Sequence, residues 1–233
     1  MGKSKDEARA VDDEHIQSCR HAVAEFFNVN LNDDTPETEL VSPLFQAWAK
    51  MADDPDIPLT EWLRDGAPAG IEHDIEVVGV FPPSIHPPSQ DFELTAYSEE
   101  LKNYDSMEDS PHGDEVLGEL VNAGYVIKCK SIDEARRLLD GEPIVSKLAL
   151  ITTEKDGVLK HRLILDCRVS GANSATAKYE RIVLPKAWDV VRDSLVLLSG
   201  GSGNCIRHFV CDFKDAFYKI PLLKEERKYF TIS

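Results

Sequence analysis

Two carboxylates near the C-terminal end of the sequence have the type and position to do chemistry. Asp212 follows directly on the apolar run 209–211, which predicts a short buried strand, and Asp215 comes three residues later. A carboxylate at the end of a buried strand is costly unless it is paired or holds a metal ion. A turn or a helix N-cap also accommodates such an aspartate, so the spacing alone leaves a metal ligand and a structural role open.

A second stretch, residues 147–168, has the pattern of a basic hairpin. Two β-rich runs flank Asp156-Gly157, the strongest short signal for a hairpin turn. Lys155 near the tip and Arg162 on the return strand can then project over one face and bind phosphate. A solvated strand edge protected by lysine has the same charges, so charge by itself leaves both interpretations open.

Together the two stretches resemble the reverse transcriptase family, over the chain from about residue 146 to its end. Residues 209–232 are similar to the first palm motif of that family without a gap. The residues that carry this likeness are Asp212, Asp215, Ala216, Phe217, Tyr218, Ile220, Pro221, Leu222 and the run 227–231. The likeness to the fingers motif is carried by residues 162–168 (Arg-Leu-Ile-Leu-Asp-Cys-Arg), Asn173 and residues 183–185 (Val-Leu-Pro).

The resemblance implies an RNA-directed DNA polymerase, which adds deoxynucleotides to a primer 3′-hydroxyl. By position, Asp212 would be the catalytic carboxylate, and with the backbone carbonyl of Phe213 it would bind Mg²⁺, of which the complete enzyme uses two ions. The partners implied are an RNA or DNA template with its primer, and deoxynucleoside triphosphates. Asp166 and Arg168 match the family's Asp-x-Arg, whose role is structural and on the template side.

The nucleotide contacts implied by the resemblance come from both motifs. Arg162 matches the triphosphate-binding arginine, and Lys155 matches the lysine at the hairpin tip. The backbone around Asp215 and Ala216 would meet the triphosphate. Phe217 occupies the position of the steric gate, where a bulky ring leaves no room for a ribose 2′-hydroxyl.

The family also needs a downstream apolar-x-Asp-Asp hairpin, and the sequence has none after Asp212. We therefore expect the N-terminal portion of a retroelement polymerase, inactive as these 233 residues alone. Two functions of other classes stay open. One is a non-catalytic nucleic-acid-binding module, and the other is an acidic interaction protein in which residues 1–90 bind a basic partner.

The charge of the chain is divided between two regions of opposite sign. The net charge is −16, yet residues 147–233 carry 15 Lys and Arg against 10 Asp and Glu, while the rest carry 11 against 32. Phosphate neutralisation by Lys and Arg dominates affinity for nucleic acid, so only the C-terminal region suits a polyanion.

The composition is that of a globular protein, with 42% hydrophobic and 29% charged residues. No apolar run is long enough to cross a membrane, and the N-terminus lacks the apolar segment of a secretion signal. The five cysteines form no Cys-x-x-Cys pair. We expect an intracellular protein with reduced cysteines and no membrane partner, with nucleus or cytoplasm left open. The sequence does not indicate an oligomeric state.

The elements that must position these residues form a mixed α/β chain in three parts. Residues 1–90 are an acidic leader with helical pieces and a Pro-rich linker, residues 91–145 a helix-strand-helix unit, and residues 146–233 the fingers and the beginning of the palm. The expected fold class is thus mixed α/β (α+β), and the resemblance implies a partial right-hand polymerase fold with fingers and the first palm strand.

Hydrophobic periodicity and capping residues predict the individual elements. Thr60 and Ser131 are the expected N-caps, and Gly66 and Gly124 the expected helix stops. A strand is expected at 125–129. Helices are expected at residues 12–28, around 45–48, around 60–64, around 94–104, and at 115–123, 131–141 and 184–198.

Overall fold

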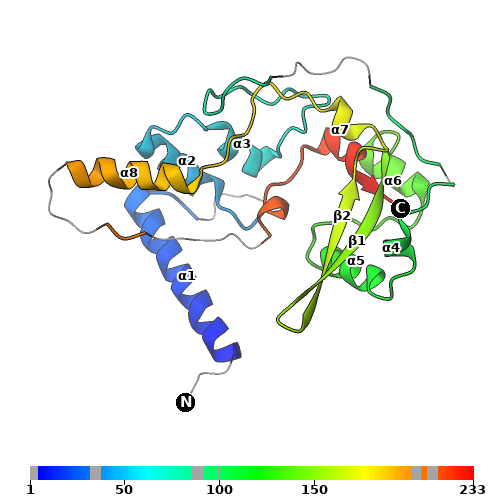
Figure 1. The fold of residues 1–233 in the computed structure, drawn as a ribbon, viewed down its shortest axis with the longest axis horizontal. Helices are drawn as coiled ribbons and strands as arrows, with labels where there is room; N and C mark the ends of the chain where they lie inside the picture. Colours follow the sequence, from blue (N-terminus) through cyan, green and yellow to red (C-terminus); the bar gives the residue numbers. More distant parts are fainter. Residues whose placement is uncertain (1–4, 32–37, 86–91, 99, 201–205, 209–214) are drawn as a thin grey trace.

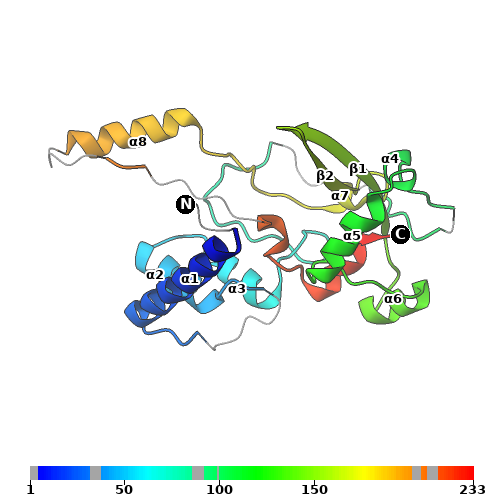
Figure 2. The ribbon, with the colours of Figure 1, turned by 90° about the horizontal axis from the view of Figure 1, so that it is seen from below.

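The computed structural model describes the chain except for residues 1–4, 32–37, 86–91, 99, 201–205 and 209–214 and the side chains of residues 5–13. It is a mixed α/β structure in which α1–α3 and α8 lie on one side and the hairpin with α4–α6 lies on the other (Figures 1 and 2). Its elements are α1 (Lys5–Phe27), α2 (Ser42–Ala52), α3 (Pro58–Asp65), α4 (Asp105–Glu108), α5 (Gly113–Asn122), α6 (Ile132–Leu139), β1 (Val145–Lys155), β2 (Val158–Asp166), α7 (Ala172–Ala175), α8 (Ala187–Ser199), the 3₁₀ helices η1 (Ala216–Tyr218) and η2 (Lys224–Phe230), and β3 (Thr231–Ile232).

The predicted hairpin is confirmed. Strands β1 and β2 pair antiparallel, from Lys147 opposite Asp166 to Lys155 opposite Val158. The two turn residues 156 and 157 have φ values of 55° and 74°, and a two-residue turn with both φ values positive matches the twist of the flanking strands. Strand β3 adds to the other edge of β1 in parallel, so the sheet order is β2-β1-β3.

One face of the hairpin makes the small hydrophobic core. Leu148 and Leu150 on β1 are buried against Met107 of α4. Side chains of a strand alternate between the two faces of a sheet, so burial of these residues leaves the alternate positions of β1 facing outward. The partly buried residues around this core are Val116, Leu117, Leu163 and Ile232.

Two helices follow their predicted capping residues closely. The N–H of Glu134 donates to the Ser131 hydroxyl at the start of α6, and the N–H of Lys130 donates to the Glu134 carboxylate. Helix α5 lies where it was expected and is followed by Gly124 with φ 77°. Helix α6 ends earlier than expected, because Asp140 rather than Gly141 takes the left-handed conformation.

Two other helices differ from their predicted bounds. Helix α1 starts at Lys5 rather than at residue 12. Helix α8 starts at Ala187 rather than at residue 184. Leu184 precedes Pro185, and the residue before a proline is disfavoured in helical geometry. The N–H of Lys186 donates instead to the Asp189 carboxylate.

Three expectations were wrong. Residues 125–129 are not a strand, and Tyr125 instead stacks its ring on Tyr218. The described residues of the segment 94–104 do not form a helix, because Thr95 donates its N–H to the carbonyl of Ser170 and Ala96 bridges to Ile144 ahead of β1. Thr60 is not an N-cap, since α3 already starts at Pro58.

Helix α3 stops at Gly66, as expected, at a φ of 104°. The chain then pairs with the segment ahead of η2 through a parallel bridge between Ala67 and Leu222. The leader therefore contacts the C-terminal part of the chain. That a domain boundary lies at residue 90 stays a prediction. Residues 81–85 of the proline-rich stretch are not helical, as expected, and Pro83 bridges to Glu180.

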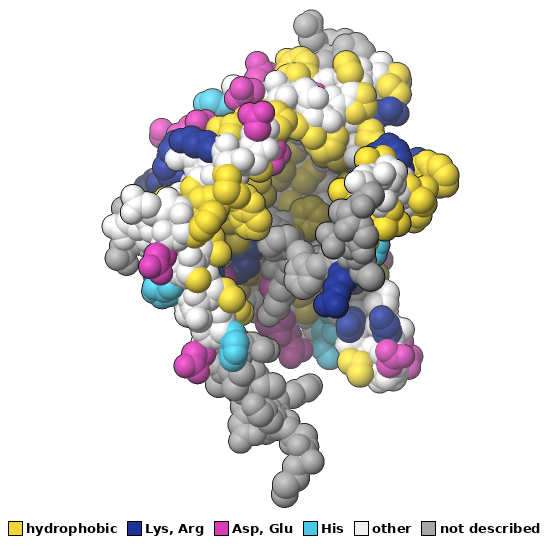
Figure 3. Space-filling model, turned by 90° about the vertical axis from the view of Figure 1, so that its left-hand side faces the viewer, with side chains coloured by type: hydrophobic (Ala, Val, Ile, Leu, Met, Phe, Trp, Pro, Cys, Tyr) yellow, Lys and Arg dark blue, Asp and Glu magenta, His cyan; other side chains and the backbone are white. Residues whose placement is uncertain are grey.

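Helix α8 has no buried residue. Its apolar side chains are exposed, with Trp188 at 71% and Leu197 at 65%. Figure 3 views the molecule from the side on which α8 lies in Figure 1, and hydrophobic side chains gather on this face. No helix in the described part of the chain is long and apolar enough to cross a membrane.

Candidate nucleic-acid interface

The outward face of the hairpin is basic. The register places Lys155 beside Val158 and Arg162 beside Ile151, and cross-strand partners share a face. Both cations therefore lie on one face, as the sequence predicted. Lys160, two residues from Arg162 on the same strand, lies on this face as well. We call Lys155, Lys160 and Arg162 the outer cationic face.

These three cations have no hydrogen-bond or ion-pair partner among the residues that the structure describes, and all three residues are exposed. The acidic neighbours of Lys155 in the chain are Glu154, which lies on the opposite face by strand alternation, and Asp156, which lies in the turn. On one strand, Lys160 and Arg162 are about 7 Å apart along the backbone. Such a strip of charges can take an extended polyanion.

The sequence analysis did not single out Lys160. Its signal was present, because a period of two from Arg162 on a predicted strand places Lys160 on the same face. At the base of this face, the Nζ atom of Lys147 lies 5.6 Å from the centre of the Tyr104 ring. Lys147 therefore already has a cation–π contact, which none of the three residues nearer the tip makes with a described ring.

The base of the hairpin is closed by Asp166 and Arg168. Asp166 is 8% exposed, and its carboxylate accepts from Arg168 Nε and Nη2, both at 2.9 Å, and from the Tyr104 hydroxyl at 2.8 Å. These donors, Arg168 first and Tyr104 second, hold the pKa of Asp166 well below its ordinary value. Through its hydrogen bond with Tyr104, Asp166 thus joins the end of β2 to the segment ahead of α4.

The two expected metal ligands, Asp212 and Phe213, lie outside the described residues, as does the strand expected at 209–211. Within the described ranges, no group of three His, Cys, Asp or Glu side chains lies close enough to hold a metal ion.

The other expected nucleotide contacts lie on the turn that follows. Asp215 has a φ of 56° and precedes η1, and its carbonyl accepts the N–H of Tyr218 at 2.9 Å. Phe217 is 96% exposed, so its ring is free to contact a ligand. This turn and the outer cationic face are separate elements in Figures 1 and 2.

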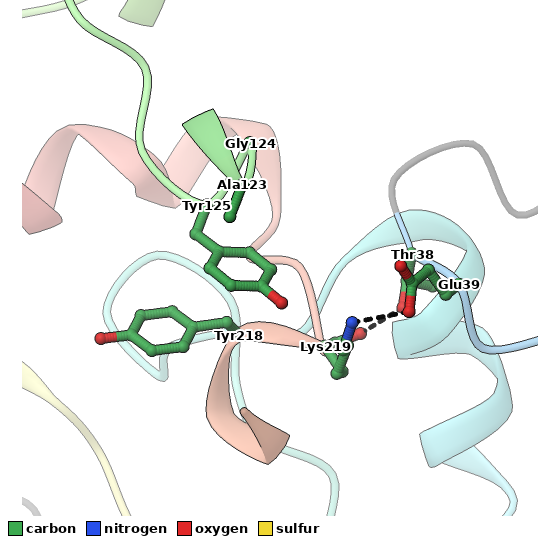
Figure 4. A pocket seen from close by; sticks show the side chains of 7 residues that line it. All are labelled: Thr38, Glu39, Ala123, Gly124, Tyr125, Tyr218 and Lys219. Atoms are coloured by element: carbon green, nitrogen blue, oxygen red, sulfur yellow. Dashed lines mark hydrogen bonds and ion pairs between the residues drawn. The ribbon is translucent and has the colours of Figure 1, made fainter. Parts of the chain in front are cut away.

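A pocket of about 320 Å³ lies beside this turn (Figure 4). The rings of Tyr125 and Tyr218 stack at its wall, with centres 4.8 Å apart and planes 12° apart. Lys219 reaches across to Glu39 of the leader, with Nζ and Oε2 2.7 Å apart, and this hydrogen bond raises the pKa of Lys219. The pocket is completed by Thr38, Ala123 and Gly124.

Comparison of the chain with protein-family models, with curated proteins and with solved structures found no match. The assignment of function therefore rests on the residues and their geometry.

Proposed function

We propose that the chain is the fingers and the start of the palm of a retroelement RNA-directed DNA polymerase. The outer cationic face is the observation that carries this proposal, because Lys155, Lys160 and Arg162 project together and have no acceptor among the described residues. Exposed cations with no structural partner are suited to phosphate, for which arginine offers two parallel donors. A polymerase of this kind would act inside the cell.

In this proposal the hairpin binds the triphosphate of the incoming nucleotide through Arg162 and Lys155. The backbone around Asp215 and Ala216 meets the same triphosphate, and the ring of Phe217 excludes a ribose 2′-hydroxyl. Mg²⁺ held by Asp212 and the carbonyl of Phe213 would lower the charge on the attacking and leaving oxygens of nucleotidyl transfer.

Nucleotide binding tests the proposal directly. We expect the chain to bind a deoxynucleoside triphosphate with Mg²⁺, and Arg162→Ala to weaken this binding by about tenfold, the value of one charge-assisted hydrogen bond. Arg137→Ala, at an exposed position on α6, is the matched control and should leave the affinity unchanged. Equal losses in both variants would remove Arg162 from the site.

Selectivity for the sugar tests the role of Phe217. Because its ring is 96% exposed, Phe217→Val should leave the fold intact while admitting ribonucleotides. The measurement is the ratio of affinities for dCTP and CTP. An unchanged ratio would show that Phe217 is not the steric gate.

The native transcript provides a test at the level of the gene. Sequence past the codon for Ser233 that encodes an apolar-x-Asp-Asp hairpin would supply the carboxylates that Asp212 needs for catalysis. A stop codon at that position in independent transcripts would exclude polymerase activity.

The same cationic face also favours a second function, a non-catalytic module that binds nucleic acid. Such a module should bind duplex with an affinity that falls steeply with salt and that survives Asp212→Asn. Affinity lost with that substitution would point back to a metal site.

A further inference from the structure

The leader follows the C-terminal segment over several contacts in the same chain direction. The hydroxyl of Thr38 donates to the carbonyl of Lys219 at 2.5 Å. Farther along both segments, Ala67 donates its N–H to the carbonyl of Pro221 at 2.7 Å and accepts the N–H of Leu223 at 3.0 Å. The segment that follows η1 is therefore lined by the acidic leader.

Gly66 allows this close approach. A Cβ at this position would lie 2.6 Å from the backbone nitrogen of Leu223 and 2.7 Å from the carbonyl of Leu222, closer than such atoms come in proteins. Its φ of 104° is also a conformation that favours glycine. The two backbones thus meet where no side chain fits.

Glu226 on η2 lies at the centre of the contact and is fully buried. Its carboxylate accepts four backbone N–H groups of the leader: those of Ile71 at 2.9 Å, Glu72 at 2.7 Å and His73 at 3.2 Å, and that of Ala69. Burial acts to raise the pKa of Glu226, but the four N–H groups outweigh it, so the pKa is lowered. The carboxylate stays charged because the leader loop solvates it.

The rim of this contact adds an ion pair and a hydroxyl bond. Lys228 lies 2.6 Å from the carboxylate of Glu72, and the hydroxyl of Tyr229 donates to the same carboxylate at 2.7 Å. Burial, followed by this hydrogen bond, raises the pKa of Tyr229 to about 12. No buried side-chain nitrogen or oxygen in the described part of the chain is left without a partner.

We propose that residues 66–73 of the leader belong to the nucleotide-binding module, and that Glu226 is a positioning residue for the turn 215–219. Glu226 fixes η2 to this loop, the loop holds Pro221 and Leu223 through Ala67, and these residues follow directly on the turn that carries Phe217. The role in nucleotide binding rests on the proposed function. The role in holding the turn rests on the contacts alone.

Amide hydrogen exchange in Glu226→Gln tests whether the turn is held. The Gln amide keeps one carbonyl oxygen, which can still accept from Ile71, Glu72 and His73, but it has no negative charge and its NH₂ group replaces the oxygen that accepts the N–H of Ala69. We expect faster exchange at the amide of Ala69, a smaller increase at those of Ile71 and Glu72, and also faster exchange at Tyr218, with the hairpin amide of Leu163 unchanged. Glu225→Gln, at the exposed neighbouring position, should change none of them. Unchanged exchange at Tyr218 would overturn the positioning role.

A milder variant covers the case in which Glu226→Gln unfolds the whole chain. Glu72→Gln removes the ion pair with Lys228 but leaves the four N–H groups on Glu226, so a smaller increase should appear at the same amides. Exchange that stays at the wild-type rate at Tyr218 in this folded variant would then overturn the proposal.

Nucleotide selectivity separates positioning from general stabilisation. Loss of a structural contact alone would leave the dCTP-to-CTP affinity ratio as it is, whereas a displaced turn should reduce it several-fold in Glu226→Gln. Retained selectivity together with faster loop exchange would make Glu226 purely structural. If the wild-type chain binds neither nucleotide, the proposed polymerase function fails, while the exchange at Tyr218 still decides whether Glu226 holds the turn.

Discussion

The outer cationic face and the contact around Glu226 differ in the burial and pairing of their charged groups. On the hairpin, three exposed cations have no acceptor among the described residues, whereas Glu226 is fully buried and accepts four backbone N–H groups. A buried charge must be paired or solvated by the protein, but an exposed one needs no partner for folding. The comparison separates a charged group that builds the fold from charged groups that are available to a ligand.

This difference predicts that the two regions respond to different perturbations. Changes at Glu226 should alter the free energy of unfolding, and changes on the hairpin should alter binding of polyanions. The following predictions would sharpen that separation or break it.

The largest effect on stability is expected from Glu226→Ala. Because it leaves several leader N–H groups without an acceptor, we expect the free energy of unfolding to fall by about 3 kcal/mol. Urea denaturation followed by circular dichroism measures this change. Glu225→Ala, at an exposed position, should change it by less than about 0.5 kcal/mol. A similar loss in both variants would mean that the buried carboxylate contributes no more to the free energy of unfolding than an exposed one.

The hairpin should show the opposite behaviour. Replacing Lys155, Lys160 and Arg162 together by alanine should weaken binding of an RNA–DNA duplex by roughly a hundredfold at low salt and reduce the salt slope by about two to three. The free energy of unfolding should stay within about 0.5 kcal/mol of the wild type. Fluorescence anisotropy over a salt series gives the slope. A loss of stability without a change in slope would contradict the assignment of this face to ligand binding.

Two glycines with positive φ test the close approach of the leader to the C-terminal segment. Gly66→Ala adds a clash with Leu223 to the conformational strain and should cost about 2 kcal/mol or more, whereas Gly79→Ala adds only strain and should cost about 1 kcal/mol. A Cβ at Gly79 meets nothing within 4 Å, although its φ is 76°. Equal costs in thermal unfolding would show that the backbones at Gly66 can separate freely.

The smallest effect is expected from pH. The pKa of Glu226 is lowered in the folded chain, as is that of Glu72, whose pKa is lowered chiefly by Lys228 and also by Tyr229. A carboxyl group whose pKa is lowered in the folded state stabilises the fold at pH values above its unfolded pKa of about 4. This stabilisation is lost as the pH falls through the folded pKa. The free energy of unfolding should therefore decline below about pH 4, and less steeply in Glu226→Gln. An equally steep decline in that variant would assign the acid sensitivity to other carboxylates.

Local signals explain which elements could be predicted from the sequence. Asp156-Gly157 determined the hairpin turn, and alternation along the strands determined that Lys155 and Arg162 share a face. Ser131 and Gly124 marked a helix start and a helix end correctly. In each case the deciding interaction is formed by residues close in sequence, so the sequence pattern already contains it.

The tertiary structure alone decided the elements that depend on distant partners. Tyr125 lies on a segment with the composition of a strand, but its ring stacks on Tyr218 and the segment forms no ladder. Whether a segment forms a strand depends on the neighbours that it packs against, and the local sequence does not determine which residues these are.

The role of Glu226 was likewise invisible in the sequence, where it is one acidic residue in a charged run. Its partners are leader amides more than 150 positions away, and a backbone N–H carries no signature of residue type. By itself, the sequence determined the hairpin and the basic face that would meet a ligand. Only the packing of the leader against η2 decided which carboxylate is buried, because burial depends on the approach of chain segments that no local pattern encodes.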